Sequence, residues 1–112
     1  MDEKEQILKE NFNEYHSSAL EAFNKKRYNT STTLFFKALV ALCDLFILIK
    51  EKKAPSSHAE RFRILEDKYQ KIYRIADRDF PFYQDSYTKK MDEETARLLK
   101  DDVEELRKIV GI

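Results

Sequence analysis

The sequence predicts an all-α fold, an up-and-down four-helix bundle formed by a single domain of residues 1–112. Apolar residues recur at three- and four-residue steps along most of the chain, as they do on one face of a helix. One Gly and two Pro in 112 residues are too few to punctuate a many-stranded sheet or to build a glycine-rich phosphate loop. The chain is 42% hydrophobic, which suffices for a core, and its length leaves no room for a second domain.

The first helix is expected over residues 3–26. Its apolar stripe consists of Leu8, Phe12, Tyr15, Ala19 and Phe23. A corner at Tyr28 and Asn29 follows, and Thr30 or Ser31 can cap a second helix that runs to about Lys52. Pro55 ends this second helix, because proline disfavours helical geometry at the residue before it.

The second helix is the most apolar part of the chain. A narrow polar line repeats every seven positions along it and consists of Thr30, Lys37, Asp44 and Glu51. Most of the circumference of this helix therefore needs cover, so we expect it to be central or to meet a second copy of the chain as well. On this ground we predict a homodimer with the second helix or its flank at a two-fold interface.

The third helix is expected over residues 57–78. Ser57 and Glu60 have the spacing of a capping box. A heptad stripe follows, made of His58, Phe62, Leu65, Tyr69, Ile72 and Ala76. The fourth helix should begin after the cap residue Asp92 and end at Gly111, with a stripe made of Ala96, Leu99, Val103, Leu106 and Val110.

The connection over residues 79–91 is long for a helical bundle and carries Phe80, Pro81, Phe82, Tyr83 and Tyr87. Long connections in compact domains are often functional. We expect an aromatic loop here, with a short fifth helix between residues 80 and 90 as the alternative.

Charge and cysteine content suggest a cytoplasmic protein without a membrane anchor. Twenty-one basic and twenty-one acidic side chains balance, so bulk attraction to nucleic acid has no support in the composition. The lone Cys43 suits a reducing compartment, and the charged N-terminus lacks a signal-peptide pattern. The strongest apolar run, residues 38–49, is shorter than the roughly 20 residues of a membrane span and contains Asp44.

One end of the predicted bundle combines basic and aromatic side chains. The candidate binding residues are Arg74, Arg78, Tyr83 and Tyr87, accompanied by Lys25, Lys26, Arg27, Tyr28, Lys89 and Lys90. Cations that follow phosphates and rings that stack on bases are typical of sites for single-stranded nucleic acid. The alternative is purely structural, since basic residues favour helix C-termini and aromatic loops often close the end of a bundle.

The opposite end offers a second candidate anion site at His58 and Arg61, in the first turn of the third helix. The alternative is a packed or solvated histidine beside an Arg61 that forms a surface ion pair. Asp44 either faces solvent along the polar line or lies in a groove paired with an arginine. Two histidines on different helices and one cysteine provide no zinc spacing, so we expect no metal and no cofactor, with a mixed carboxylate site as the alternative.

The layout resembles the HEPN superfamily of small helical domains, especially stand-alone archaeal-type members of unknown function. The resemblance covers about residues 3–110. It rests on the Tyr28–Asn29 corner, the run Phe35-Phe36-Lys37-Ala38 and the Pro-x-Ser-His opening at residues 55–58. It implies a four- or five-helix bundle, usually a homodimer, associated with nucleotidyltransferases, toxin and antitoxin pairs or RNA processing.

Catalytic members of that superfamily cut RNA with an arginine followed after four to six residues by a histidine. Neither Arg74 nor Arg78 nor any other arginine here has a histidine at that spacing. The first hypothesis is therefore a non-catalytic dimeric module that binds nucleotide, RNA or a protein partner such as a nucleotidyltransferase. The alternatives are a degenerate metal-independent ribonuclease, with His58 as general base and Arg61 or Arg78 at the phosphorane, and a structural scaffold.

Overall fold

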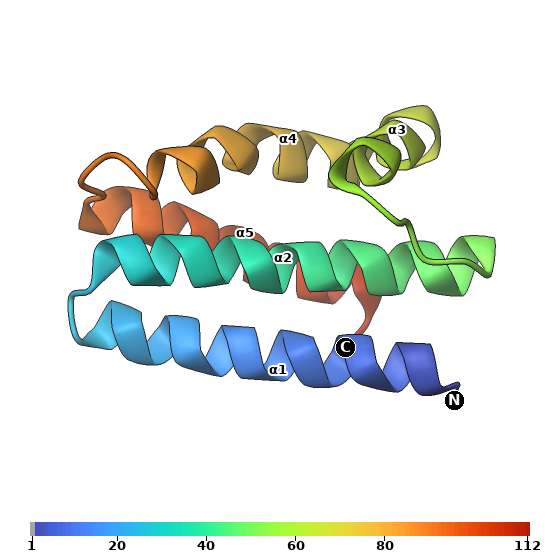
Figure 1. Cartoon of the computed structure of the whole chain (residues 1–112), viewed down its shortest axis with the longest axis horizontal. Coiled ribbons are helices and arrows are strands. Elements are labelled where there is room, and N and C mark those ends of the chain that lie inside the picture. Colours follow the sequence, from blue (N-terminus) through green and yellow to red (C-terminus); the bar gives the residue numbers. More distant parts are fainter. Residues whose placement is uncertain (1) are drawn as a thin grey trace.

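The computed structural model describes residues 2–112, which form five helices and no strand. The helices are α1 (Glu3–Asn24), α2 (Tyr28–Glu51), α3 (His58–Lys68), α4 (Gln70–Asp85) and α5 (Glu93–Val110). α1, α2, α4 and α5 run alternately up and down, while the short α3 is turned out of their common direction (Figure 1). The all-α prediction is confirmed, with one more helix than the four expected.

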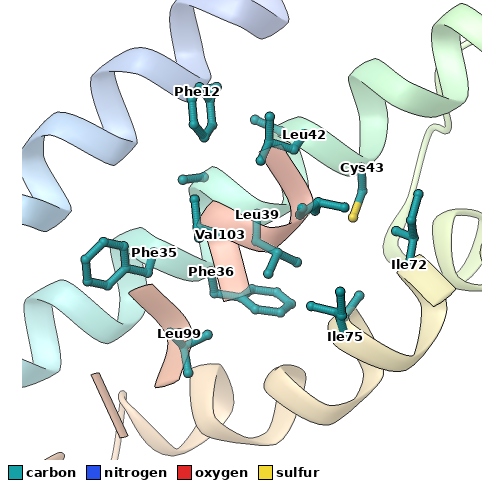
Figure 2. Close-up of a cluster of buried hydrophobic side chains, with 14 of the residues drawn as sticks. Phe12, Phe35, Phe36, Leu39, Leu42, Cys43, Ile72, Ile75, Leu99 and Val103 are labelled. Atoms are coloured by element: carbon teal, nitrogen blue, oxygen red, sulfur yellow. The ribbon is translucent and has the colours of Figure 1, made fainter. Parts of the chain in front are cut away.

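α2 is the centre of the fold, with α1 and α4 on either side of it and α5 behind it in the view of Figure 1. Phe36 and Leu39 of α2 face Ile75 of α4, and Phe12 of α1 approaches from the opposite side (Figure 2). Twelve of the 24 residues of α2 are buried within one chain. The expectation of a central helix is confirmed, and its cover comes from the neighbouring helices of the same chain.

The predicted third helix over residues 57–78 is wrong in one respect, because the structure divides it at Tyr69. This residue leaves helical geometry with φ −134° and ψ 64°, ending α3 and opening α4. Its hydroxyl donates to Glu51 at the end of α2, and its ring meets Phe46 edge-on with centroids 4.9 Å apart. Its partners Glu51 and Phe46 are distant from Tyr69 in the sequence, so the heptad stripe does not indicate the break.

The predicted aromatic loop over residues 79–91 is mostly helix. α4 continues through Pro81 to Asp85, and only the segment 86–92 connects it to α5. A proline inside a helix leaves one carbonyl without its usual donor and costs roughly 3 kcal/mol. The aromatic packing offsets this cost, since Tyr83 stacks on Phe36 at 4.7 Å and Phe80 lies 5.8 Å from the same ring.

The helix ends agree with the sequence in three places and differ in one. Asp92 accepts from the backbone N–H of Thr95 at 2.8 Å, Gly111 closes α5 with φ 87°, and Ser57 accepts from Glu60 N–H at 3.1 Å. The predicted cap at Thr30 or Ser31 is wrong, because α2 already begins at Tyr28 without a side-chain cap.

Asn29 fixes the segment 86–91 against the start of α2. Its amide donates to the carbonyls of Ser86 at 2.9 Å and Lys89 at 2.6 Å, and its carbonyl accepts from the N–H of Met91 at 3.0 Å. The position just before Thr30 thus ties the α4–α5 connection to the α1–α2 corner.

α2 is long and apolar enough to cross a membrane by length and composition alone, with a mean hydropathy of 2.1 over its most apolar window. In the fold, 61% of that window is buried. A buried central helix of a compact protein has the same composition, so this finding is weak support for a membrane span.

Candidate functional site

The polar line of α2 faces α3 and α4. Lys37 points its Nζ at the hydroxyl of Tyr83, 3.5 Å away, and Asp44 pairs with Arg61. Two turns further along α2, Glu51 accepts from Lys68 at 2.8 Å and from the hydroxyl of Tyr69. The seven-residue repeat therefore marks the seam along which the second half of the chain docks on α2.

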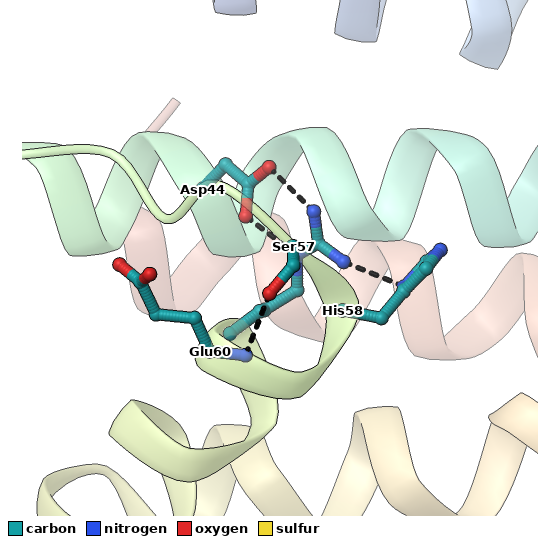
Figure 3. A network of polar contacts seen from close by, with 5 residues as sticks. Asp44, Ser57, His58 and Glu60 are labelled. Atoms are coloured by element: carbon teal, nitrogen blue, oxygen red, sulfur yellow. Dashed lines mark hydrogen bonds and ion pairs between the residues drawn. The ribbon is translucent and has the colours of Figure 1, made fainter.

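Asp44 and Arg61 form a bidentate pair across this seam (Figure 3). Arg61 Nε lies 2.6 Å from Asp44 Oδ1 and Nη2 lies 2.9 Å from Oδ2. The Arg61 side chain is only 9% exposed and that of Asp44 13%. Of the two alternatives for Asp44, the groove pairing with an arginine is the one observed. Arg61 is likewise in an ion pair, but a buried one.

His58 completes this arrangement, with Nδ1 2.7 Å from Arg61 Nη1. A guanidinium only donates hydrogen bonds, so Nδ1 must accept and the proton of the neutral ring lies on Nε2. Burial, followed by the charge of Arg61, lowers the pKa of His58 below its usual value. At neutral pH the ring is therefore uncharged and presents an N–H at Nε2.

A recess of about 190 Å³ opens beside this imidazole. Four helices contribute its lining, which consists of Tyr15, Phe36, Lys37, Val40, His58, Arg61 and Tyr83. Phe36 is 1% exposed and Arg61 8%, so these two residues form its closed side. The recess thus joins aromatic walls to polar donors, the combination typical of small-molecule sites.

Lys37 supplies the net charge of the recess. Its ammonium has no carboxylate within ion-pair distance among residues 2–112, whereas the charge of Arg61 is neutralised by Asp44. Burial and the charge of Arg61 lower the pKa of His58 most, and the Lys37 charge adds to this lowering. The hydrogen bond with Tyr83 raises the pKa of Tyr87, and the Lys37 charge opposes that rise. Lys37 therefore lies between the imidazole and the tyrosines, with one uncompensated positive charge.

Tyr83 and Tyr87 extend the recess to the surface. Their hydroxyls are 2.8 Å apart and their rings meet edge-on at 5.4 Å. Lys37 Nζ lies 5.6 Å from the centroid of the Tyr83 ring, and Tyr87 is 65% exposed. These two predicted residues are brought together, and Tyr87 presents a free aromatic face.

Arg74 and Arg78 belong to a different part of the molecule. They lie one turn apart in the middle of α4, and Arg78 is about 10 Å along the axis from Asp85 at 1.5 Å per residue. Arg78 Nη2 binds Asp102 Oδ1 at 2.7 Å, toward α5. Neither arginine lines the recess at Tyr83, so the structure does not bring Arg74 and Arg78 into the predicted grouping with Tyr83 and Tyr87.

Beneath Arg78 two acidic side chains are buried between α4 and α5. Asp79 is 0% exposed and Asp102 4%. Neither carboxyl oxygen of Asp79 has a hydrogen-bond donor, nor has Oδ2 of Asp102. Burial, followed by the proximity of Asp102, raises the pKa of Asp79 to about 9. Asp79 is thus protonated at neutral pH and can donate its proton to Asp102.

The structure brings together only some residues of the predicted basic end of the bundle. A surface recess of about 360 Å³ is lined by Lys26, Arg27, Tyr28, Asn29, Thr30, Lys90 and Met91. Lys25 instead pairs with Glu21 and Lys89 with Asp85. The cations of this recess are exposed surface side chains, so it lacks the buried polar partners that define the recess at His58.

Four residues that line the His58 recess are not identified as site residues from the sequence: Tyr15, Phe36, Lys37 and Val40. The apolar spacing of the first helix favours a core position for Tyr15, and Phe36 and Val40 lie in the most apolar part of the chain. Lys37 carried the only available signal, since it is a cation on the polar line without a carboxylate at helical spacing within α2. Among residues 2–112 no group of three or more His, Cys, Asp or Glu side chains could hold a metal ion.

Comparison of the chain with protein-family models, with curated proteins and with solved structures finds no match. The resemblance to the HEPN superfamily therefore stays a prediction, and no relative assigns a role to the recess.

Proposed function

We propose that this protein is a non-catalytic binding module for nucleotides or single-stranded RNA. The carrying observation is the uncompensated ammonium of Lys37 inside a recess that also offers the Nε2–H of His58 and the hydroxyl of Tyr83. Cationic and neutral donors together suit a phosphate, and the exposed ring of Tyr87 suits a stacked base. The phosphate and the base of a nucleotide thus have complementary surfaces next to each other.

The protonation of His58 supports binding over catalysis. A general base needs a free lone pair, but Nδ1 accepts from Arg61 and Nε2 carries the proton. Arg61 is held by Asp44, and Arg78 lies toward α5, so neither is free to stabilise a phosphorane at His58. These contacts disfavour the degenerate ribonuclease.

Replacement of Lys37 by Met tests this proposal, since it keeps the aliphatic stem and removes the charge. We expect Lys37→Met to weaken binding of a labelled mixed-sequence RNA about ten-fold and to reduce the salt dependence of binding by about one phosphate contact. Fluorescence anisotropy at two or more salt concentrations measures both. Lys50→Met, also on α2 but exposed outside the recess, is the matched control.

A double Arg74→Ala and Arg78→Ala variant distinguishes the two surfaces of α4. The proposal predicts that it binds RNA nearly as well as the original protein. A large loss in this variant, together with unchanged binding by Lys37→Met, would move the site to the middle of α4.

Homodimerisation through α2 and a cytoplasmic location belong to the same proposal. Ile49 at the end of α2 is 37% exposed and supports an interface there, and the buried free thiol of Cys43 suits a reducing compartment. Light scattering at micromolar concentration should give twice the 13.4 kDa chain mass. A measured mass of a single chain would contradict the predicted homodimer without contradicting the proposed binding site.

A further inference from the structure

We propose that the recess at Lys37 and His58 takes a terminal phosphate monoester, carried by a mononucleotide or by the end of an RNA strand, in preference to an internal phosphodiester. This inference rests on the proposed function and specifies its ligand. Three observations support it: the closed shape of the recess, its donors and its charge.

The shape of the recess favours a chain end. Its lining comes from α1, α2, α3 and α4, and the buried Phe36 and Arg61 close it from behind. A strand that continues in both directions needs an open groove, whereas a recess closed on one side admits an end group. Its volume of about 190 Å³ is below the ~300 Å³ of pockets that enclose whole drug-sized ligands. One phosphate group therefore enters while its nucleoside stays outside, near Tyr87.

The donors suit a group with three free oxygens. Lys37 Nζ, His58 Nε2–H and the hydrogen-bonded Tyr83–Tyr87 hydroxyl pair all supply protons. A phosphate monoester offers three acceptor oxygens, whereas an internal diester offers two unesterified ones. Both oxygens of Asp44 are occupied by Arg61, so its lone pairs are not directed at the ligand.

The net charge of the recess also favours a phosphate monoester over a diester. Arg61 and Asp44 cancel, His58 is neutral, and Lys37 remains as a single positive charge. A phosphate monoester carries about −1.5 to −2 at pH 7, against −1 for a diester, so the ammonium attracts it more strongly.

Matched ligands test this inference directly. One RNA decamer is prepared with a 5′-phosphate, with a 3′-phosphate and with hydroxyl groups at both ends, and adenosine monophosphate is compared with its methyl ester and with adenosine. We expect either terminal phosphate to improve the affinity about ten-fold over the unphosphorylated decamer, measured by calorimetry or anisotropy. A preference for adenosine monophosphate over its methyl ester would show that the second charge is recognised. Preference for one RNA end alone, or for the mononucleotide alone, identifies the source of the group.

Two variants link the preference to the recess. Lys37→Met and His58→Asn should lose the preference for the phosphorylated decamers, so that each variant binds phosphorylated and unphosphorylated decamers with equal affinity. His58→Asn retains an oxygen that can accept from Arg61, so the buried pair is kept while the Nε2–H is lost. Lys50→Met should keep the full preference.

The possible failures are distinguishable. Equal affinity of the original protein for phosphorylated and unphosphorylated decamers, with both weakened by Lys37→Met, would overturn the terminal-phosphate inference and leave RNA binding in place. No measurable binding of any decamer or of adenosine monophosphate would overturn the proposed function as well.

Discussion

Two contacts in this molecule join helices through aspartate and arginine, and they are satisfied in different ways. At the α2–α3 contact, both oxygens of Asp44 are bound by one nearly buried Arg61. At the α4–α5 contact, Arg78 is 54% exposed and donates to one oxygen of Asp102. Its Nε lies 3.6 Å from Oδ1 of Asp79, which has no hydrogen-bond donor. The first contact balances one negative charge with one positive charge, whereas the second has one carboxyl group more than it has cations.

The difference shows how burial determines what a carboxyl group does. A buried carboxylate stays charged where a guanidinium supplies two hydrogen bonds, and it takes up a proton where no donor is available. Asp44 therefore contributes a negative charge that Arg61 balances, whereas Asp79 holds a proton that it can donate to Asp102. Substitutions at these two contacts test this contrast.

Removal of Arg61 should have the largest effect on stability. Arg61→Met leaves Asp44 without either donor, and breaking a buried pair in this way costs about 3–5 kcal/mol of the free energy of unfolding. Urea denaturation followed by circular dichroism measures the change. Arg63→Met, an exposed position two residues further along α3, is the control and should change stability by no more than about 0.5 kcal/mol. A cost below 1 kcal/mol for Arg61→Met would contradict the contrast.

Asp79 should make the protein less stable as the pH rises. Its pKa is about 9 when folded and 3.8 in the unfolded reference. Between these values the folded protein holds a proton that the unfolded chain has released, so the free energy of unfolding decreases with pH until about pH 9. Asp79→Asn should flatten this decrease and be more stable than the original protein at pH 9, by roughly 1–3 kcal/mol.

Denaturation midpoints at pH 6, 7.5 and 9 measure this slope. Asp101→Asn, at an exposed position next to Asp102, should keep the original slope. An Asp79→Asn protein that loses stability with rising pH as steeply as the original would show that Asp79 is already ionised at neutral pH.

Removal of Arg78 should have a smaller effect than removal of Arg61. Its side chain is 54% exposed, so water replaces much of what it gives to Asp102, and Arg78→Met should cost about 1 kcal/mol or less. The same urea denaturation measures it beside Arg61→Met. Equal costs for the two variants would mean that the α4–α5 contact depends on its arginine as strongly as the α2–α3 contact does.

His58 should have the smallest effect on the free energy of unfolding, and this effect should occur at acidic pH. Because burial and Arg61 lower its pKa, the unfolded chain binds a proton more readily than the folded protein, and stability is lost as the pH falls below the unfolded value of 6.5. The ring is exposed, so the loss should be a few tenths of a kcal/mol. His58→Asn should remove it, and His16, present in both proteins, contributes equally to both curves. Identical curves for the two proteins between pH 5 and 7 would contradict the assigned hydrogen bond.

The fold class and most helix ends follow from the order of the residues alone. Periodic apolar residues act over three or four positions, and caps such as Ser57, Asp92 and Gly111 act within a single turn, so this information is local. The seven-residue polar line of α2 also predicted which side of that helix would need polar partners.

Three features depend on the packing of the helices: the break at Tyr69, the continuation of α4 through Pro81 and the position of the candidate site. The contacts that decide them join residues far apart in sequence: Tyr69 with Glu51, Tyr83 with Phe36, and Arg61 with Asp44. A local pattern cannot specify such contacts, because their energy exists only once separate helices have packed. For that reason the chain could be recognised as a helical bundle from its sequence, while the placement of Lys37 beside His58 and Tyr83 required the fold.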